Sequence, residues 1–232
     1  MEFEAPLLEG RFLRRYKRFF AEVEVPQLGI VTAHCPNTGS MLGCLTPGAA
    51  ARLSRAANPN RKLAYTLELL RVGTTWVGVN PARANRLVEE AVRAGRIPEL
   101  SGYAGVRREV PYGESSRIDL LLERPGAPAC YVEVKSVTLG RPPLAQFPDA
   151  VSARAAKHMG ELARQVAGGA RACVVFAVQR EDCEVFAPAD DIDPAYGRAV
   201  RDAHSAGVEL LAYRATVQPA GIALRDRLPV RL

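Results

Sequence analysis

Two strand-like runs near the middle of the chain carry charged residues where a sheet core should be apolar. The first run, RIDLLL, contains Asp119, and the second run, CYVEVKSV, contains Glu133 and Lys135. Burying these groups singly is strongly unfavourable, so they need mutual pairing, a metal ion or solvent. Any fold of this chain must therefore provide such partners for three charged side chains within a sheet.

The position of each charge within its run predicts where the three side chains meet. Side chains alternate between the two faces of a strand, so Glu133 and Lys135 point to the same face. The turn residues RPGAPA separate the two runs and indicate that the strands pair with each other. Asp119 then converges with the other two charges on one side of the sheet.

These residue types suit metal-assisted hydrolysis of a phosphate ester. Asp119 and Glu133 supply hard oxygen ligands that can hold Mg²⁺ or Mn²⁺ beside a phosphate. Lys135 is one of only four lysines in a chain that otherwise uses arginine, and its compact charge can position water or stabilise a transition state. The alternative is a structural ion pair between Glu133 and Lys135 on a solvent-facing edge strand.

The elements around these runs predict a mixed sheet flanked by helices. A helix opens with Asn80 as N-cap and Pro81 at its first position and closes on Gly95. The runs RREVPY, SRIDLLLE and ACYVEVKSVTL follow it as strands, and RACVVFAV is apolar throughout, as expected of a central strand. With later helices over 152–166 and 194–206 and a strand in VELLAYRATV, the order is α-β-β-β-α-β-α-β.

The helix over 152–166 has one apolar and one polar face. The residues predicted to face inward are Val151, Ala155, Met159, Leu162 and Val166, and those predicted to face outward are Arg154, Lys157, Glu161 and Arg164. Asp149 is the predicted cap of this helix rather than a metal ligand.

The first 80 residues follow a different pattern. Short strand-like runs alternate with turn residues: RFLRRYKRFFAEVEV, GIVTAHC, AARLSRA, YTLELLRV and TTWVGVN. About five such strands match an OB-fold barrel. The sequence therefore predicts a two-domain protein of the α+β/α/β class, with an OB-like barrel over 1–80 and the mixed sheet over 81–232.

Positive charge concentrates in the predicted barrel. Residues 1–80 hold ten Lys and Arg against six Glu, a balance of +4 within a total of +6. An anionic partner such as DNA fits this balance. The candidate nucleic-acid contacts are Arg14, Arg15, Lys17 and Arg18 in RRYKRFF, His34 and Asn37 in HCPNTGS, and Arg154, Lys157 and His158 on the later helix. Each set has a structural alternative: solvated charges on a barrel strand, a simple turn, or a solvated helix face.

Other features bear on the cellular compartment. The N-terminus begins with acidic residues and lacks the apolar segment of a signal peptide, and ACVVFAV is too short to span a bilayer. The five cysteines form an odd set without CxxC spacing. These features predict a cytoplasmic protein with free thiols and no membrane partner.

The spacing Asp119–x13–Glu133–x–Lys135, after one helix and before another, resembles the PD-(D/E)XK nuclease superfamily. The resemblance covers roughly residues 80–180 and departs from the named motif at Ile118, where the superfamily has Pro. Some members add a Glu from the preceding helix, and Glu90 is the position that would correspond. A surface pair between Glu90 and Arg86 is the alternative.

A second resemblance covers nearly the whole chain. The blocks RYKRFFAEV, HCPNTGSMLGC, NRLVEEA, ELSGY, SRIDLLL, YVEVKSVTL, FPDAVSARAAKHM and GVELLAYRA occur in the order of the sugar fermentation stimulation protein family, SfsA. This resemblance implies an OB-like domain fused to a PD-(D/E)XK-like domain, DNA binding with little sequence preference, and a regulatory role in sugar (maltose) metabolism genes.

Three functions stay open at this point. The first is a DNA-binding protein with a Mg²⁺- or Mn²⁺-dependent nuclease site, and the second is a non-enzymatic DNA-binding regulator with a remnant of that site. The third is a hydrolase of small phosphate compounds. DNA is the expected partner and RNA an alternative; a homodimer would suit a nuclease that cuts duplexes, although no residue identifies one.

Overall fold

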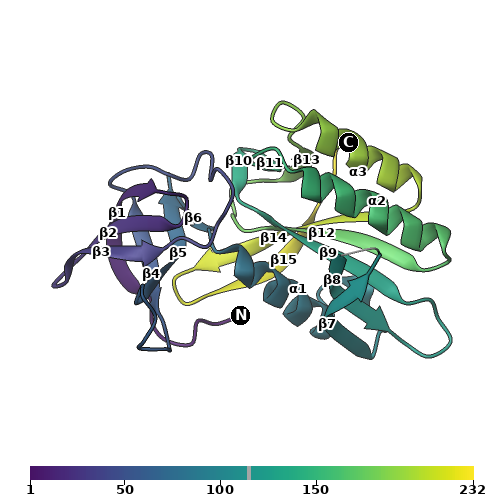
Figure 1. Cartoon of the computed structure of the whole chain (residues 1–232), viewed down its shortest axis with the longest axis horizontal. Coiled ribbons are helices and arrows are strands. Elements are labelled where there is room, and N and C mark those ends of the chain that lie inside the picture. Colours follow the sequence, from purple (N-terminus) through teal and green to yellow (C-terminus); the bar gives the residue numbers. More distant parts are fainter. Residues whose placement is uncertain (114–115) are drawn as a thin grey trace.

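The computed structural model describes residues 1–113 and 116–232, and in them the chain forms a barrel followed by a helix-flanked sheet (Figure 1). No helix in these two ranges is long and apolar enough to cross a membrane. The barrel strands are β1 (Leu8–Tyr16), β2 (Phe20–Val25), β3 (Gly29–His34), β4 (Ala50–Arg55), β5 (Tyr65–Val72) and β6 (Thr75–Gly78).

Five of these strands close the predicted OB barrel. They follow the order β3-β2-β1-β4-β5, and a pairing between His34 of β3 and Thr66 of β5 closes the ring, while β6 extends β5 as a hairpin. The single strand predicted over RFLRRYKRFFAEVEV is wrong, because the chain reverses within it. Lys17 and Arg18 adopt φ values of 46° and 62°, which turn β1 back into β2.

The second domain opens with a short 3₁₀ turn (Pro81–Arg83) that runs into α1 (Ala84–Arg93). Asn80 caps this turn as predicted, its side chain accepting a hydrogen bond from the Ala82 N–H. The predicted apolar face of α1 is confirmed, since its five members are all buried: Ala84, Leu87, Val88, Ala91 and Val92.

The main sheet has the order β15-β14-β12-β9-β8-β7. Its strands are β7 (Gly105–Tyr112), β8 (Ser116–Glu123), β9 (Cys130–Val137), β12 (Arg171–Val178), β14 (Glu209–Gln218) and β15 (Gly221–Leu228). The central position predicted for RACVVFAV is confirmed: β12 is parallel to both β9 and β14. Helix α1 covers one face of the sheet, and α2 (Ala153–Ala167) and α3 (Pro194–Ser205) cover the other (Figure 1).

Several elements were not predicted. Strand β15 and the short 3₁₀ helix Pro98–Leu100 are two of them, and the other three form a small sheet of β10 (Leu139–Arg141), β11 (Leu144–Phe147) and β13 (Val185–Pro188). The sequences of the three strands in the small sheet are short and interrupted by Pro and Gly, so they lack the clear alternation of apolar and polar residues that predicts a strand.

Three predictions about α2 are wrong. Ser152 caps the helix by accepting from the Ala155 N–H, while Asp149 bonds to the barrel. Val151 precedes the helix and is 75% exposed instead of facing inward. Glu161 is buried instead of facing outward, with Lys157 at 3.5 Å and Arg164 at 4.0 Å from its carboxylate.

A buried carboxylate fixes the junction between the two domains. Glu68 of β5 has a 1% exposed side chain and accepts two hydrogen bonds from Arg83, at 2.8 and 3.1 Å. Asn80 and Ser54 donate to the same carboxylate. The start of α1 is thereby attached to the barrel wall.

Removing the Arg83 side chain should destabilise the protein. Arg83→Ala leaves the Glu68 charge buried with only neutral donors, and we expect the free energy of unfolding to fall by about 2–4 kcal/mol. Denaturant unfolding measures this. The matched control is Arg11→Ala, which breaks an exposed pair with Glu24 and should cost less than about 1 kcal/mol; equal losses in the two variants would contradict the account.

Candidate metal and phosphate site

The hairpin β8–β9 brings the three predicted residues together. The antiparallel register pairs Leu120 with Val132. Asp119 comes just before Leu120 on β8 and Glu133 just after Val132 on β9, so the two carboxylates lie at the same end of the paired segment. Asp119 accepts a hydrogen bond from the Val134 N–H at 2.7 Å. The convergence expected from strand alternation is therefore present.

Asp119 is also held from the helix side. Its second oxygen accepts a hydrogen bond from the Asn85 side chain of α1 at 2.7 Å. Because one donor contacts each oxygen, the carboxylate plane is fixed and each oxygen keeps a free lone pair.

Glu133 is almost completely buried and uses its two oxygens differently. Oε1 is 2.7 Å from the Lys135 ammonium and 2.5 Å from Nδ1 of His158 on α2. No described residue hydrogen-bonds to Oε2. A buried carboxylate oxygen without a partner is costly, so Oε2 is the atom at which a ligand would be most favourable.

The two carboxylates differ in their pKa shifts. Burial, followed by the nearby charge of Glu133, raises the pKa of Asp119 to about 6. Burial also acts to raise the pKa of Glu133, but the hydrogen bond with His158 and the charge of Lys135 outweigh it and bring that pKa below its usual value. Asp119 thus resists ionisation beside a carboxylate that is already charged, and a cation between them would relieve this repulsion.

The donor set fits a hard divalent cation. Asp119 and Glu133 Oε2 supply two carboxylate oxygens, and Mg²⁺ usually takes one or two protein carboxylates with water and phosphate oxygens completing its shell. In the part of the chain that the structure describes, no group of three or more His, Cys, Asp and Glu side chains forms a metal site. A metal here would therefore keep open positions for a substrate.

A cavity of about 760 Å³ lies over this site, and Asp119, Glu133, Lys135 and His158 all line it. Its rim carries cationic side chains from two elements, namely Arg117 of β8 and Arg154 and Lys157 of α2. Such a rim suits the phosphates of a nucleic acid. The three α2 residues predicted as nucleic-acid contacts thus lie at the carboxylate site, and His158 additionally holds Glu133.

The cations of RRYKRFF are mostly engaged within the barrel. Arg14 forms a bidentate pair with Glu22, and Arg15 and Arg18 donate to backbone carbonyls of the 37–40 loop. Lys17 is exposed at the tip of the β1–β2 hairpin. The pairing limits how many of these charges can meet phosphates.

The remaining candidates lie in two other places. His34 is 2.9 Å from the Arg61 guanidinium through Nδ1, and Asn37 is buried, with its side chain accepting from the Gly39 N–H. Glu90 is not among the residues that line the 760 Å³ cavity; its carboxylate pairs with the Met1 amino group and with Arg86.

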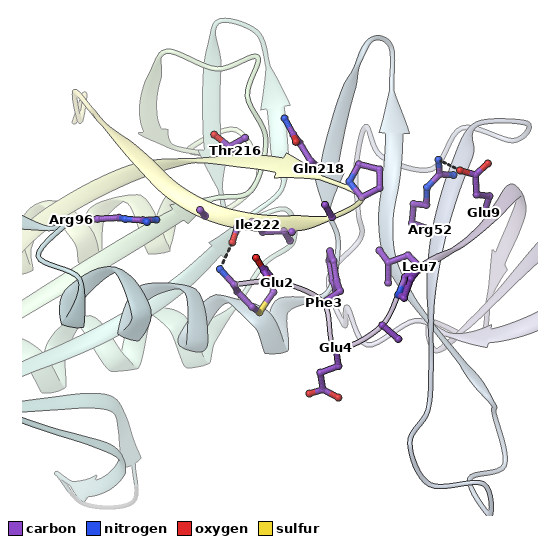
Figure 2. A pocket seen from close by; sticks show the side chains of 17 residues that line it. Glu2, Phe3, Glu4, Leu7, Glu9, Arg52, Arg96, Thr216, Gln218 and Ile222 are labelled. Atoms are coloured by element: carbon purple, nitrogen blue, oxygen red, sulfur yellow. Dashed lines mark hydrogen bonds and ion pairs between the residues drawn. The ribbon is translucent and has the colours of Figure 1, made fainter.

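Another cavity, of about 810 Å³, is lined by the N-terminal segment, by the β14–β15 hairpin that this segment pairs with, and by Arg52 of the barrel (Figure 2). Its charged side chains do not converge: Glu9 pairs with Arg52 at the barrel end, and Arg96 lies at the opposite end (Figure 2). The 760 Å³ cavity, where charged side chains converge, is therefore the better candidate for a metal and phosphate site.

The sequence did not reveal every residue of the site. Asn85 is the one asparagine in α1, and its poor helix propensity was a weak indication that its side chain has a role beyond forming the helix. Tyr112 and Tyr196 place buried hydroxyls without described partners behind the site, where burial and the charge of Glu133 raise the pKa of each phenol. Nothing in the local sequence marks these tyrosines, because β7 and α3 are brought to the site only by the tertiary fold.

Comparisons with known proteins agree with this architecture. The family model described as the sugar fermentation stimulation protein RE domain matches residues 82–221, and that of the SfsA N-terminal OB domain matches residues 13–79. The sugar fermentation stimulation protein homolog of Maricaulis maris is 54% identical, with 100% of this chain and 99% of that protein covered. The homolog of Geobacter sulfurreducens is 53% identical, with 97% and 96% covered.

A solved structure shows the same fold. Pyrococcus furiosus SfsA in complex with Ca²⁺ superposes with a TM-score of 0.91 at 30% identity, over 100% of this chain and 98% of that one. The similarity therefore extends through both domains.

Proposed function

The chain belongs to the sugar fermentation stimulation protein family, and on that premise we propose that it is a DNA-binding protein that hydrolyses phosphodiester bonds with Mg²⁺ or Mn²⁺. The observation that carries the proposal is the buried pair of Asp119 and Glu133, which line a cation-rimmed cavity and include one carboxylate oxygen, Glu133 Oε2, without a partner among the described residues. The Ca²⁺ complex of the Pyrococcus protein supports a cation-binding role, since Ca²⁺ also selects oxygen ligands.

Each residue has a distinct part in this chemistry. Asp119 and Glu133 would hold the metal, which when bound polarises a phosphoryl oxygen and makes a coordinated water more acidic. Lys135, which contacts Glu133 Oε1, would stabilise negative charge that develops on the phosphate. His158 fixes the orientation of Glu133, as the outer partners of metal ligands commonly do.

A cleavage assay tests the proposal. Purified protein is incubated with plasmid and with single-stranded DNA in Mn²⁺, in Mg²⁺ and in EDTA. We expect cleavage that requires the metal, stops in EDTA and co-elutes with the protein on a sizing column. Binding without cleavage in either metal would contradict hydrolysis and favour a DNA-binding regulator with an inactive site.

Metal affinity should depend on pH. Because the pKa of Asp119 is raised to about 6, a proton competes with the metal below that pH. We expect the Mn²⁺ affinity to be flat above about pH 7 and to fall by up to about tenfold per unit below about pH 6. Isothermal titration calorimetry measures this, and an affinity that rises on acidification would contradict the role of Asp119.

DNA affinity should fall with salt, and two arginines should differ in their contributions. Arg154 is exposed on the cavity rim and pairs with none of the described carboxylates, whereas Arg14 is paired with Glu22. We expect Arg154→Gln to reduce the slope of log affinity against log salt by about one, and Arg14→Gln to change it little. A slope of zero in the unmodified protein would exclude phosphate contacts.

A further inference from the structure

The barrel contributes directly to the cavity over the carboxylates. Thr38, from the loop after β3, lines the same 760 Å³ cavity as Asp119, Glu133 and Lys135. A smaller cavity of about 390 Å³ adjoins the 760 Å³ cavity, and Thr38, Lys135 and Phe147 line both. The two cavities therefore form one cleft between the domains, with Thr38 at their junction.

The loop that carries Thr38 is held firmly by the barrel. Arg15 donates to the carbonyls of Asn37 and Gly39 at 2.7 and 3.0 Å, and Arg18 donates to the carbonyl of Thr38 at 2.7 Å. Arg15 also donates to the Ser40 carbonyl at 3.3 Å, so two guanidinium groups fix four consecutive carbonyls. The two arginines therefore hold in place the loop that forms one wall of the cleft.

The same loop is attached to the second domain. The Met41 N–H donates to the Asp149 carboxylate at 2.7 Å, and the Ser40 hydroxyl donates to the Asp149 carbonyl. Gly39 packs so closely that an added Cβ would lie 2.3 Å from an Asp149 oxygen. Since Asp149 lies shortly before α2, which carries His158, the loop and the site are held in one arrangement.

The side chain of Thr38 is available to a substrate. It is exposed, and its hydroxyl makes no hydrogen bond within the described parts of the chain. Phe147, which also lines both cavities, packs against the rings of Phe176 and Tyr196, with centroids 6.3 and 5.2 Å away. A hydroxyl and an aromatic ring that line the same cleft can contact one nucleotide, with its base stacked on the ring and its sugar or phosphate near the hydroxyl.

The size and depth of the cleft restrict its ligand. Glu133 and Lys135 are 3% and 8% exposed, so a reacting phosphate would reach them only through this cavity, whose lining includes the barrel loop and α2. Cavities of 760 and 390 Å³ are in the range that holds one molecule of drug size, which is the scale of a nucleotide or two. A cavity of this size can hold one strand, whose unpaired bases are free to stack on an aromatic ring.

We propose, on the basis of the proposed hydrolysis, that the cleft is a subsite for a single DNA strand. The nucleotide next to the reacting phosphate lies between Thr38 and Phe147, and the barrel loop is one wall of the active site. Thr38 is then a substrate-contacting residue supplied by the OB domain.

Fluorescence anisotropy in EDTA tests the subsite without any need for cleavage. The probes are a labelled single-stranded oligonucleotide of about 12 nucleotides and the duplex of the same sequence. Thr38→Trp fills the cleft, and Thr38→Asp places a negative charge there with little change in volume. Thr74→Trp, in the exposed β5–β6 turn outside both cavities, is the matched control.

We expect the single strand to bind about tenfold more tightly than the duplex, and both Thr38 variants to lose about tenfold in single-strand affinity. The Thr74 control should bind as the unmodified protein does, and thermal unfolding checks that all variants are folded. Equal affinity for both probes together with unaffected Thr38 variants would overturn the inference.

The result separates this inference from the proposed hydrolysis. Single-strand binding that depends on Thr38, without cleavage in Mn²⁺, supports the subsite and contradicts hydrolysis. Mn²⁺-dependent cleavage that prefers duplex and is unchanged in both Thr38 variants supports hydrolysis and overturns the subsite.

Discussion

Asp119→Ala should lower the rate of Mn²⁺-dependent DNA cleavage by about 10³-fold or more, since a metal contributes several kcal/mol to a hydrolytic transition state. The substitution removes one of the two carboxylates that can bind the metal and leaves the Asn85 and Val134 donors without their acceptor. Gel-based cleavage with labelled DNA measures the rate, and calorimetry should show that Mn²⁺ binding is lost as well.

The matched control for this variant is Asp190→Ala. Asp190 is a surface carboxylate that pairs with Arg201, so its removal should leave cleavage and Mn²⁺ binding unchanged. Cleavage that persists at the same rate in Asp119→Ala would mean that the reaction occurs elsewhere or comes from a contaminant.

Lys135→Met should reduce cleavage by about 10²–10³-fold, the usual loss when one group that stabilises a transition-state charge is removed. Methionine keeps most of the side-chain volume but removes the ammonium that contacts Glu133 Oε1. Because both carboxylates and the His158 contact remain, Mn²⁺ should still bind. Loss of turnover with retained metal binding distinguishes this role from that of Asp119.

Lys62→Met is the control for the loss of a lysine charge, since Lys62 is exposed in the β4–β5 loop and lines neither part of the cleft. Lys135→Arg adds a further comparison: the larger guanidinium should not restore the rate, because it cannot occupy the same buried position as a compact ammonium. Full activity in Lys135→Met would show that the ammonium only balances the charge of Glu133.

The centre of the site could be predicted because it depends on local rules. Strand alternation places Glu133 and Lys135 on one face, and a short turn between two strands brings Asp119 beside them. The OB barrel and the central strand β12 could also be predicted. Turn residues between short strand-like runs indicate the barrel, and a continuous apolar run indicates β12.

The roles of the barrel arginines could not be predicted in the same way. Arg14 pairs with Glu22 only because the chain reverses between them, and the expected single strand would have kept the two apart. Arg15 and Arg18 donate to carbonyls about 20 residues away. Side-chain composition alone does not distinguish such structural donors from free phosphate contacts.

The errors around α2 have a similar origin. Asp149 is a good capping residue by type, but the barrel loop offers it the Met41 N–H, and Ser152 caps the helix instead. Glu161 looked like a surface charge because its neighbours on α2 are cations; the fold buries it while Lys157 and Arg164 remain in reach. The position of Asp149 and the burial of Glu161 both depend on contacts with residues far away in the sequence.

The most direct test of the account is a crystal structure of the protein grown in Mn²⁺, with data collected to detect anomalous scattering from manganese. We predict a peak between Asp119 and Glu133, within ligand distance of Glu133 Oε2. An empty site at saturating Mn²⁺, or a peak only at another position, would contradict the assignment of these carboxylates as the metal ligands.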